Sequence, residues 1–216
     1  MRSPFSSRLL NYHPRINIPN SAVEPEKTRD VILSLIEAIE PYDDLELEHK
    51  NDVLAWIKSG AQLFRIAKPD NPPKHLVSYF VLFDDKTHQI MLIDHVNAEL
   101  WLPAGGHVEI NENPETTVVR EAMEELTIDA RFDTVFGSCP LFVTVTETKG
   151  TNTHTDVSLW YVIGGDSSHT LIFDRAEMNS YKWLSFDEVS GVDISELDPH
   201  MHRFVGKMQK HLSHKQ

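Results

Sequence analysis

Three closely spaced glutamates carry the clearest chemical signal in this sequence: Glu121, Glu124 and Glu125. They fall in a segment that we expect to form a helix from Pro114 to Leu126. Asn113 is a good N-cap for that helix, and proline is favoured at its first position. At 100° per residue, the three side chains occupy about one hundred degrees of the helical wheel. The carboxylates therefore share one face of the predicted helix.

The other face of this helix is apolar and consists of Val118, Val119, Ala122, Met123 and Leu126. We expect it to pack on a sheet, with Val118, Ala122 and Leu126 buried, because an amphipathic helix turns its apolar side to the core. The three glutamates would then be exposed to a common cleft.

Three like charges on one helical face repel one another, and anions in the C-terminal half of a helix also oppose its dipole. A bound cation would remove both penalties. Ligands that are all oxygen atoms favour Mg²⁺, Mn²⁺ or Ca²⁺ over zinc. The alternative interpretation is a solvated acidic face, which is the usual nature of a charge run.

The residues around the helix reproduce the spacing of the Nudix box, G-x5-E-x7-R-E-U-x-E-E-x-G-U, in which U is apolar. The matching positions are Gly106, Glu112, Arg120, Glu121, Ala122, Glu124, Glu125 and Ile128. Thr127 stands where the family usually has glycine, at the helix C-terminus, where glycine serves as a cap. The chain therefore resembles the Nudix hydrolases, over about residues 70–212.

This resemblance implies a hydrolase that uses water and Mg²⁺ (or Mn²⁺) to cleave a diphosphate linkage in a nucleotide or a nucleoside diphosphate derivative. The implied metal ligands are Glu121, Glu124, Glu125 and the carbonyl of Gly105. Arg120 would pair with Glu112 and hold the loop and the helix together. The box does not fix the general base, which is either a box glutamate or a later carboxylate, with Glu147 and Glu177 as candidates.

Candidates for contact with the substrate lie on both sides of the box. Trp101 is a candidate for stacking on a base, whereas Phe142 is more typical of a core residue. Gly106 and His107 are placed to approach a phosphate. His154 lies in a polar stretch and could also contact a phosphate, but an ordinary surface position is the simpler interpretation of this residue. The histidines show no convincing zinc spacing with cysteine.

The resemblance also implies an α+β fold, an α/β/α sandwich with a mixed sheet, here with a helical extension at the N-terminus. We divide the chain into an irregular tail at 1–23, a helical extension at 24–68 and a Nudix domain at 69–216. In the extension, apolar residues recur every four positions in two segments. Two such short helices must pack on the Nudix domain or on a partner subunit. Strands are expected at 75–83, 89–93, 130–136, 141–148, 157–163 and 181–184, and a final helix at 199–212.

The composition of the chain limits the kinds of partner and the cellular location that we expect. Lys and Arg number 20 and Asp and Glu 33, which gives a formal charge of −13 and disfavours nucleic acid as a partner. No apolar run approaches the roughly 20 residues of a membrane span, so no membrane association is expected. The lone cysteine, Cys139, excludes an intrachain disulfide and fits a cytoplasmic location. A transit peptide at the N-terminus is a less favoured interpretation. The sequence is also compatible with a homodimer.

Two other functions are compatible with the same fold. A non-catalytic regulator that senses a nucleotide usually loses box carboxylates, yet all of them are present here. An isopentenyl-diphosphate isomerase relative needs a cysteine and a glutamate across the pocket, and the surroundings of Cys139 do not resemble that site. The order of preference is therefore hydrolase, regulator, isomerase. The substrate stays open between ADP-ribose, oxidised nucleoside triphosphates and other nucleotide pyrophosphates.

Overall fold

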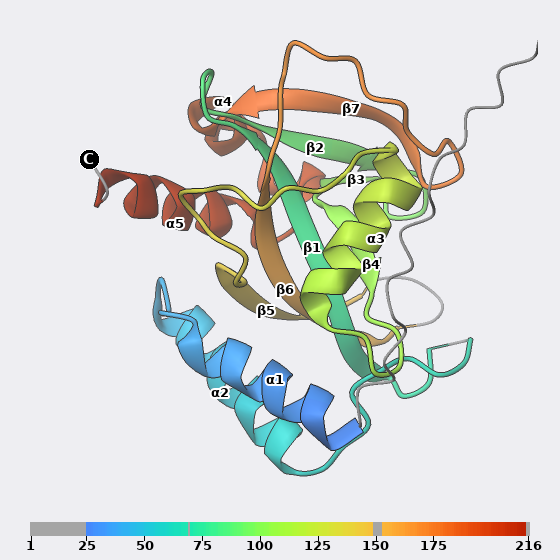
Figure 1. The fold of residues 1–216 in the computed structure, drawn as a ribbon. Helices are drawn as coiled ribbons and strands as arrows, with labels where there is room; N and C mark the ends of the chain where they lie inside the picture. Colours follow the sequence, from blue (N-terminus) through green and yellow to red (C-terminus); the bar gives the residue numbers. More distant parts are fainter. Residues whose placement is uncertain (1–24, 69, 149–152, 215–216) are drawn as a thin grey trace, which may run out of the picture.

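The computed structural model describes residues 25–68, 70–148 and 153–214. The irregular tail expected at 1–23 lies outside these residues. Within them, seven strands form one mixed sheet in the order β3-β2-β1-β6-β5, and β4 also pairs with β1 and β7 with β2 (Figure 1). The strands are β1 (Lys74–Asp84), β2 (Gln89–His95), β3 (Leu100–Leu102), β4 (Ala104–His107), β5 (Phe142–Glu147), β6 (Thr155–Gly164) and β7 (Met178–Ser185). The pair β1 and β6 is parallel, and the other pairs of this sheet are antiparallel.

Helices cover both faces of this sheet, with α3 on one face and α4 and α5 on the other (Figure 1). The helices are α1 (Pro25–Ala38), α2 (Asp44–Lys58), α3 (Pro114–Leu126), α4 (Phe186–Gly191), the 3₁₀ turn η1 (Ile194–Glu196) and α5 (Met201–Ser213). This arrangement confirms the expected α/β/α sandwich with a mixed sheet and N-terminal helices. Within the described ranges, no helix is long and apolar enough to cross a membrane.

The N-terminal helices share the apolar core that lies beneath α3. Ile32 and Ile36 of α1 and Val53 and Ile57 of α2 are at most 1% exposed. They belong to the same apolar cluster as the sheet residues under α3. Burying side chains of this size stabilises the fold by about 1.5–3 kcal/mol each. The extension is thus packed within its own chain.

Two ion pairs join α2 to α5. Glu46 is fully buried and accepts hydrogen bonds from Lys207 Nζ at 2.7 Å and from the Val143 N–H of β5 at 3.3 Å. Asp43, the N-cap of α2, accepts from Arg203 Nε at 2.7 Å and from its Nη2 at 2.5 Å. A buried carboxylate needs such partners, because an unpaired buried charge is strongly destabilising. These contacts fix the helical pair against β5 and α5.

Helix α3 begins and ends at the residues that the sequence predicts. Asn113 caps its first turn by accepting from the Glu115 N–H at 3.1 Å. Its last turn closes at Thr127, which has a φ of 56° and lies in the left-handed region. The N–H of Ile128 then reaches back to the Ala122 carbonyl at 3.2 Å. Thr127 therefore adopts the backbone conformation for which glycine is favoured at a helix end.

The buried side of α3 agrees only in part with the predicted apolar face. Its fully buried apolar residues are Val118, Ala122 and Leu126, as expected. The prediction that Val119 and Met123 also pack on the sheet is wrong, because they are 43% and 45% exposed. Thr117 and Glu125 are buried in their place. The helix is therefore rotated so that part of its acidic face lies against the neighbouring strand.

The prediction of a strand at 130–136 is also wrong. This segment makes one isolated bridge, between Phe132 and Ile163, and then turns. The Asp133 carboxylate causes the turn by accepting from the N–H groups of Val135 at 2.7 Å and Phe136 at 3.1 Å. An aspartate that satisfies the next backbone donors in this way favours a turn over a sheet ladder.

Candidate active site

An open cleft of about 1200 Å³ brings most of the expected site residues together. From α3 it is lined by Arg120, Glu121, Glu124 and Glu125. From β4 it is lined by Gly105, Gly106 and His107. The three glutamates of α3 thus face one cleft, as their helical spacing predicts.

Two glycines are required where β4 passes α3. Gly105 has a φ of +133°, which side chains rarely tolerate, and a Cβ there would collide with the Ser78 carbonyl oxygen. A Cβ on Gly106 would collide with the Glu121 carboxylate. The main chain of β4 therefore runs directly against the acidic face of α3, and the Gly105 N–H donates to Glu125 Oε2 at 3.1 Å.

Arg120 holds the loop, the strand and the acidic face together. Its Nε and Nη2 donate to the two carboxylate oxygens of Glu112 at 3.0 Å each, and Nη2 also donates to the His107 carbonyl at 3.1 Å. Its Nη1 donates to Glu121 at 2.7 Å and to Glu124 at 3.2 Å. The guanidinium thus pairs with Glu112 and also fixes two of the three α3 glutamates.

The α3 carboxylates are held in an unfavourable electrostatic environment. Glu125 is 6% exposed, and burial together with the charge of Glu121 raises its pKa to about 8. Burial also raises the pKa of Glu121, whereas the side chain of Glu124 is 59% exposed. A cation between these groups would offset both the burial and the repulsion. A donor set of carboxylate oxygens suits Mg²⁺ or Mn²⁺, so the residues fit the ion that the resemblance implies.

Other candidate residues lie elsewhere. The described residues that line the cleft do not include Trp101, Glu112 or Glu147. Trp101 packs beside Lys182, whose Nζ lies 3.8 Å from the ring centroid, so this geometry gives no support to stacking on a base. Phe142 is fully buried in the core. Of the two later carboxylates considered as a general base, Glu177 lines the cleft.

Several cleft residues were not expected from the sequence. Arg65, Lys68, Asp70 and Tyr79 line the cleft. His154, expected at the surface, has a side chain only 16% exposed and lies 3.3 Å from Asp70 and 3.2 Å from Asp156. Burial, together with the charge of Arg65, lowers the pKa of His107 to about 4. Contacts between segments that are distant in the sequence bring these residues together, and such contacts cannot be inferred from the spacing of the residues.

Comparison with known proteins identifies the family of this chain. Residues 73–207 match the family model described as NUDIX domain, and the chain therefore belongs to the Nudix family. It is a hydrolase of the class that acts on phosphorus-containing acid anhydrides. The resemblance of the box to this family is thus confirmed. Among curated proteins, no match was found.

Solved structures of similar fold cover about two thirds of this chain. A C. elegans Ap4A hydrolase in a binary complex is 14% identical, with a TM-score of 0.50, over 64% of this chain and 97% of the other. A NUDIX hydrolase from Clostridium perfringens is 19% identical, with a TM-score of 0.48, over 66% and 98%. The MutT protein from Methanosarcina mazei Go1 is 18% identical, with a TM-score of 0.49, over 65% and 96%.

Proposed function

We propose that this protein hydrolyses a diphosphate linkage in a nucleotide or a nucleoside diphosphate derivative, by attack of water at phosphorus, with Mg²⁺ or Mn²⁺ as cofactor. The observation that carries this proposal is the convergence of Glu121, Glu124 and Glu125 on one cleft, directly beside the glycine pair. Two of these carboxylates are buried enough for their pKa values to be raised. A divalent cation bound there would stabilise these carboxylates in their charged form.

The charge of the cleft supports the need for a metal ion. Among the described residues, eight carboxylates line it: Asp70, Glu109, Glu121, Glu124, Glu125, Asp156, Asp174 and Glu177. The described cationic residues that line it are Arg65, Lys68 and Arg120. A diphosphate brought to this excess of negative charge would be repelled. Divalent cations reverse that repulsion and favour binding of an anionic substrate.

Each residue then has a separate task. Glu121, Glu124 and Glu125, with the Gly105 carbonyl, would hold the cation, which neutralises phosphoryl oxygens and lowers the pKa of water. Arg120 positions two of these glutamates through its contacts with their oxygens. Gly106 lines the cleft and is the candidate for main-chain contact with the substrate, and its lack of a Cβ leaves room for the Glu121 carboxylate. Glu177 is the candidate for accepting a proton from the attacking water, because it lines the same cleft.

A panel of nucleotide pyrophosphates tests this function. It includes ADP-ribose, dinucleoside polyphosphates and ordinary and oxidised nucleoside triphosphates, each with Mg²⁺ or Mn²⁺. Products are identified by mass spectrometry in ¹⁸O-labelled water, which shows the phosphorus atom that is attacked. We expect metal-dependent cleavage of at least one compound, with one ¹⁸O in a phosphate product. Tight nucleotide binding without turnover under any metal would instead identify a regulator.

We also infer that the partner is a small molecule and that the protein acts in the cytoplasm. The cytoplasmic location is supported by the lone cysteine, Cys139, which is an exposed free thiol and is more compatible with a reducing compartment. A homodimer remains a prediction, and the mass of the full chain in solution, measured by light scattering, tests it.

A further inference from the structure

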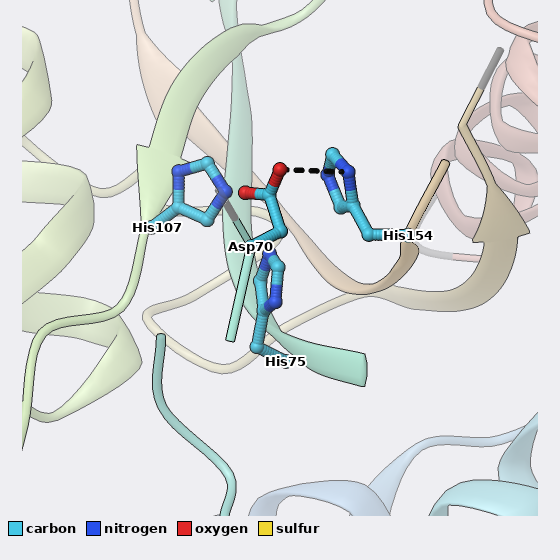
Figure 2. Close-up of side chains that lie close together, drawn as sticks. All are labelled: Asp70, His75, His107 and His154. Atoms are coloured by element: carbon cyan, nitrogen blue, oxygen red, sulfur yellow. Dashed lines mark ion pairs between the residues drawn. The ribbon is translucent and has the colours of Figure 1, made fainter. Parts of the chain in front are cut away.

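A second group of side chains at the cleft has the composition of a metal site. Asp70, His75, His107 and His154 surround one point, and their ligand atoms lie within 4.8 Å of one another (Figure 2). Its donors are mainly imidazole nitrogens, whereas those of the α3 site are oxygens. We propose that these four residues bind a divalent transition-metal ion of the zinc type, at a site separate from the α3 glutamates.

Strand register places His75, His107 and Asp156 close together, and His154 and Asp70 join them from the segments that precede β6 and β1. His75 of β1 pairs with Asp156 of β6, and Val77, two residues further along β1, pairs with His107 of β4. His154 lies two residues before Asp156. Because side chains alternate between the faces of a sheet, these positions share one face. The convergence of the three histidines is therefore a consequence of the sheet and not of one flexible loop.

Two imidazole nitrogens are buried in this group without a hydrogen bond. His75 is fully buried, and its Nδ1 donates to the Pro72 carbonyl at 2.9 Å, so Nε2 is the nitrogen left to bind a metal ion. None of the described residues forms a hydrogen bond with His75 Nε2 or with His107 Nε2. Buried polar atoms without partners are rare. A histidine that donates one nitrogen to a carbonyl while the other faces its neighbours is typical of a metal ligand.

Two carboxylates supply negative charge to the same place. Asp70 Oδ2 lies 3.3 Å from His154 Nδ1, while its Oδ1 is 3.2 Å from Arg65. Asp156 Oδ1 lies 3.2 Å from His154 Nε2 and 3.4 Å from His75 Nε2. Asp70 therefore offers one oxygen as a ligand, and Asp156 adds a second negative charge beside the rings.

A network of protonated histidines would not account for this arrangement. The ring centroid of His75 lies 4.8 Å from that of His107 and 5.0 Å from that of His154. Protonated rings at these distances would repel one another, and a neutral His154 would leave a nitrogen lone pair beside the carboxylate of Asp70 or Asp156. A bound cation of the zinc type removes both difficulties, because imidazole nitrogens are among its preferred ligands.

The geometry requires only a small adjustment. Four ligand atoms at 2.0–2.1 Å from a tetrahedral zinc ion stand about 3.4 Å apart. The present atoms lie within 4.8 Å, so small side-chain rotations would close the site. His107 directly follows the glycine pair, and its carbonyl accepts from Arg120. A metal ion here would therefore fix the end of β4 beside the α3 glutamates.

The test measures metal binding by the full chain and does not depend on activity. Zn²⁺ affinity is measured by competition with a chromophoric chelator in the wild type and in His107→Ala, His154→Ala and Asp70→Asn. His169→Ala is the matched control, because the side chain of His169 is 77% exposed and outside the group. Glu124→Gln shows whether the ion sits on α3 instead. Bound Co²⁺ reports the coordination through its visible absorption.

We expect one tight Zn²⁺ per chain in the wild type, in His169→Ala and in Glu124→Gln, with a four-coordinate Co²⁺ spectrum. Loss of one ligand should weaken binding on the order of 100-fold. Circular dichroism checks the fold of each variant, and His154→Gln repeats the test with a polar side chain. Equal affinity in the wild type and in the double variant of His107 and His154 would overturn the proposal. Loss of binding in Glu124→Gln alone would overturn it too.

Discussion

The guanidinium of Arg120 donates two hydrogen bonds to the carboxylate of Glu112, both at 3.0 Å. This fork joins the loop before α3 to the middle of the helix. The remaining nitrogen of Arg120 contacts Glu121 and Glu124. The position of the proposed magnesium ligands therefore depends on a planar group that lysine cannot replace.

We expect Arg120→Lys to lower the free energy of unfolding by about 2 kcal/mol, because it loses the paired hydrogen bonds and leaves a partly buried Glu112 without them. Urea unfolding at neutral pH measures this change. Arg131→Lys is the control, since Arg131 is exposed and should differ little from the wild type. Equal stability of the two variants would contradict a structural role for the fork.

Glu124→Gln and Glu125→Gln should each reduce turnover by about a thousandfold, which corresponds to about 4 kcal/mol of activation free energy. Each change keeps the shape of the side chain and removes one negative charge from the proposed metal site. The steady-state rate at saturating metal measures the effect. Glu115→Gln, on the same helix but not among the residues lining the cleft, should stay near the wild-type rate. Normal turnover in both site variants would contradict their role as ligands.

The buried pair of Glu46 and Lys207 joins the N-terminal helices to α5. Glu46→Ala leaves the Lys207 ammonium buried without its partner, and we expect a loss of about 3–5 kcal/mol in the free energy of unfolding. The double change Glu46→Ala with Lys207→Met removes both charges and should cost less than the sum of the two single changes. A double-mutant cycle in urea measures the coupling. A double variant as unstable as the sum of the single variants would show that the pair is not coupled.

The ion pair of Asp43 with Arg203 should make the stability of the fold depend on pH in acid. Hydrogen bonds from Arg203 lower the pKa of its carboxyl from 3.8 to about 2. A lowered folded-state pKa means that the stabilisation is complete above about pH 4 and is lost as the pH falls toward 2. Since the side chain is 33% exposed, screening reduces the contribution to about 1 kcal/mol.

Asp43→Asn isolates this charge, because asparagine is an equally good N-cap. Urea unfolding should show the variant to be less stable than the wild type near neutral pH, with the difference shrinking as the pH approaches 2. A difference that is constant with pH would exclude the ion pair as its cause.

Thr127→Gly should raise the free energy of unfolding by about 1 kcal/mol. A β-branched residue in the left-handed region costs about 1–2 kcal/mol, part of which is offset by the greater freedom of glycine in the unfolded chain. Thr116→Gly is the matched control within α3, where glycine should destabilise the helix by about 0.3 kcal/mol, the difference between the helix propensities of threonine and glycine. Thermal and urea unfolding of both variants measure these opposite signs, and a loss of stability in Thr127→Gly would contradict the strain.

Features determined by neighbouring residues could be predicted from the sequence. The bounds of α3 follow from Asn113, Pro114 and the helical period, and these are all local signals. The same holds for the positions of β1, β2 and β5 to β7, whose apolar runs and turns are continuous in the chain. The acidic face of α3 was likewise visible, because a helix fixes the directions of its side chains.

Features determined by distant contacts could not be predicted. Val119 and Met123 are apolar, yet they are exposed, because the close approach of β4 at Gly106 sets the rotation of α3. His75 and His107 are far apart in the sequence, and their meeting depends on the register of two different strand pairs. Spacing along one chain contains no information on that register.

Strand β5 is the last in the sheet order, and an edge strand offers its main-chain groups as a template for other extended chains. Here α2 lies against β5 (Figure 1), and Glu46 occupies the Val143 N–H. Helices α1 and α2 therefore cover this edge of the sheet. A chain that lost them through proteolysis would expose the backbone groups of β5 to pairing with strands of other chains. Cleavage near α2 is therefore expected to promote aggregation.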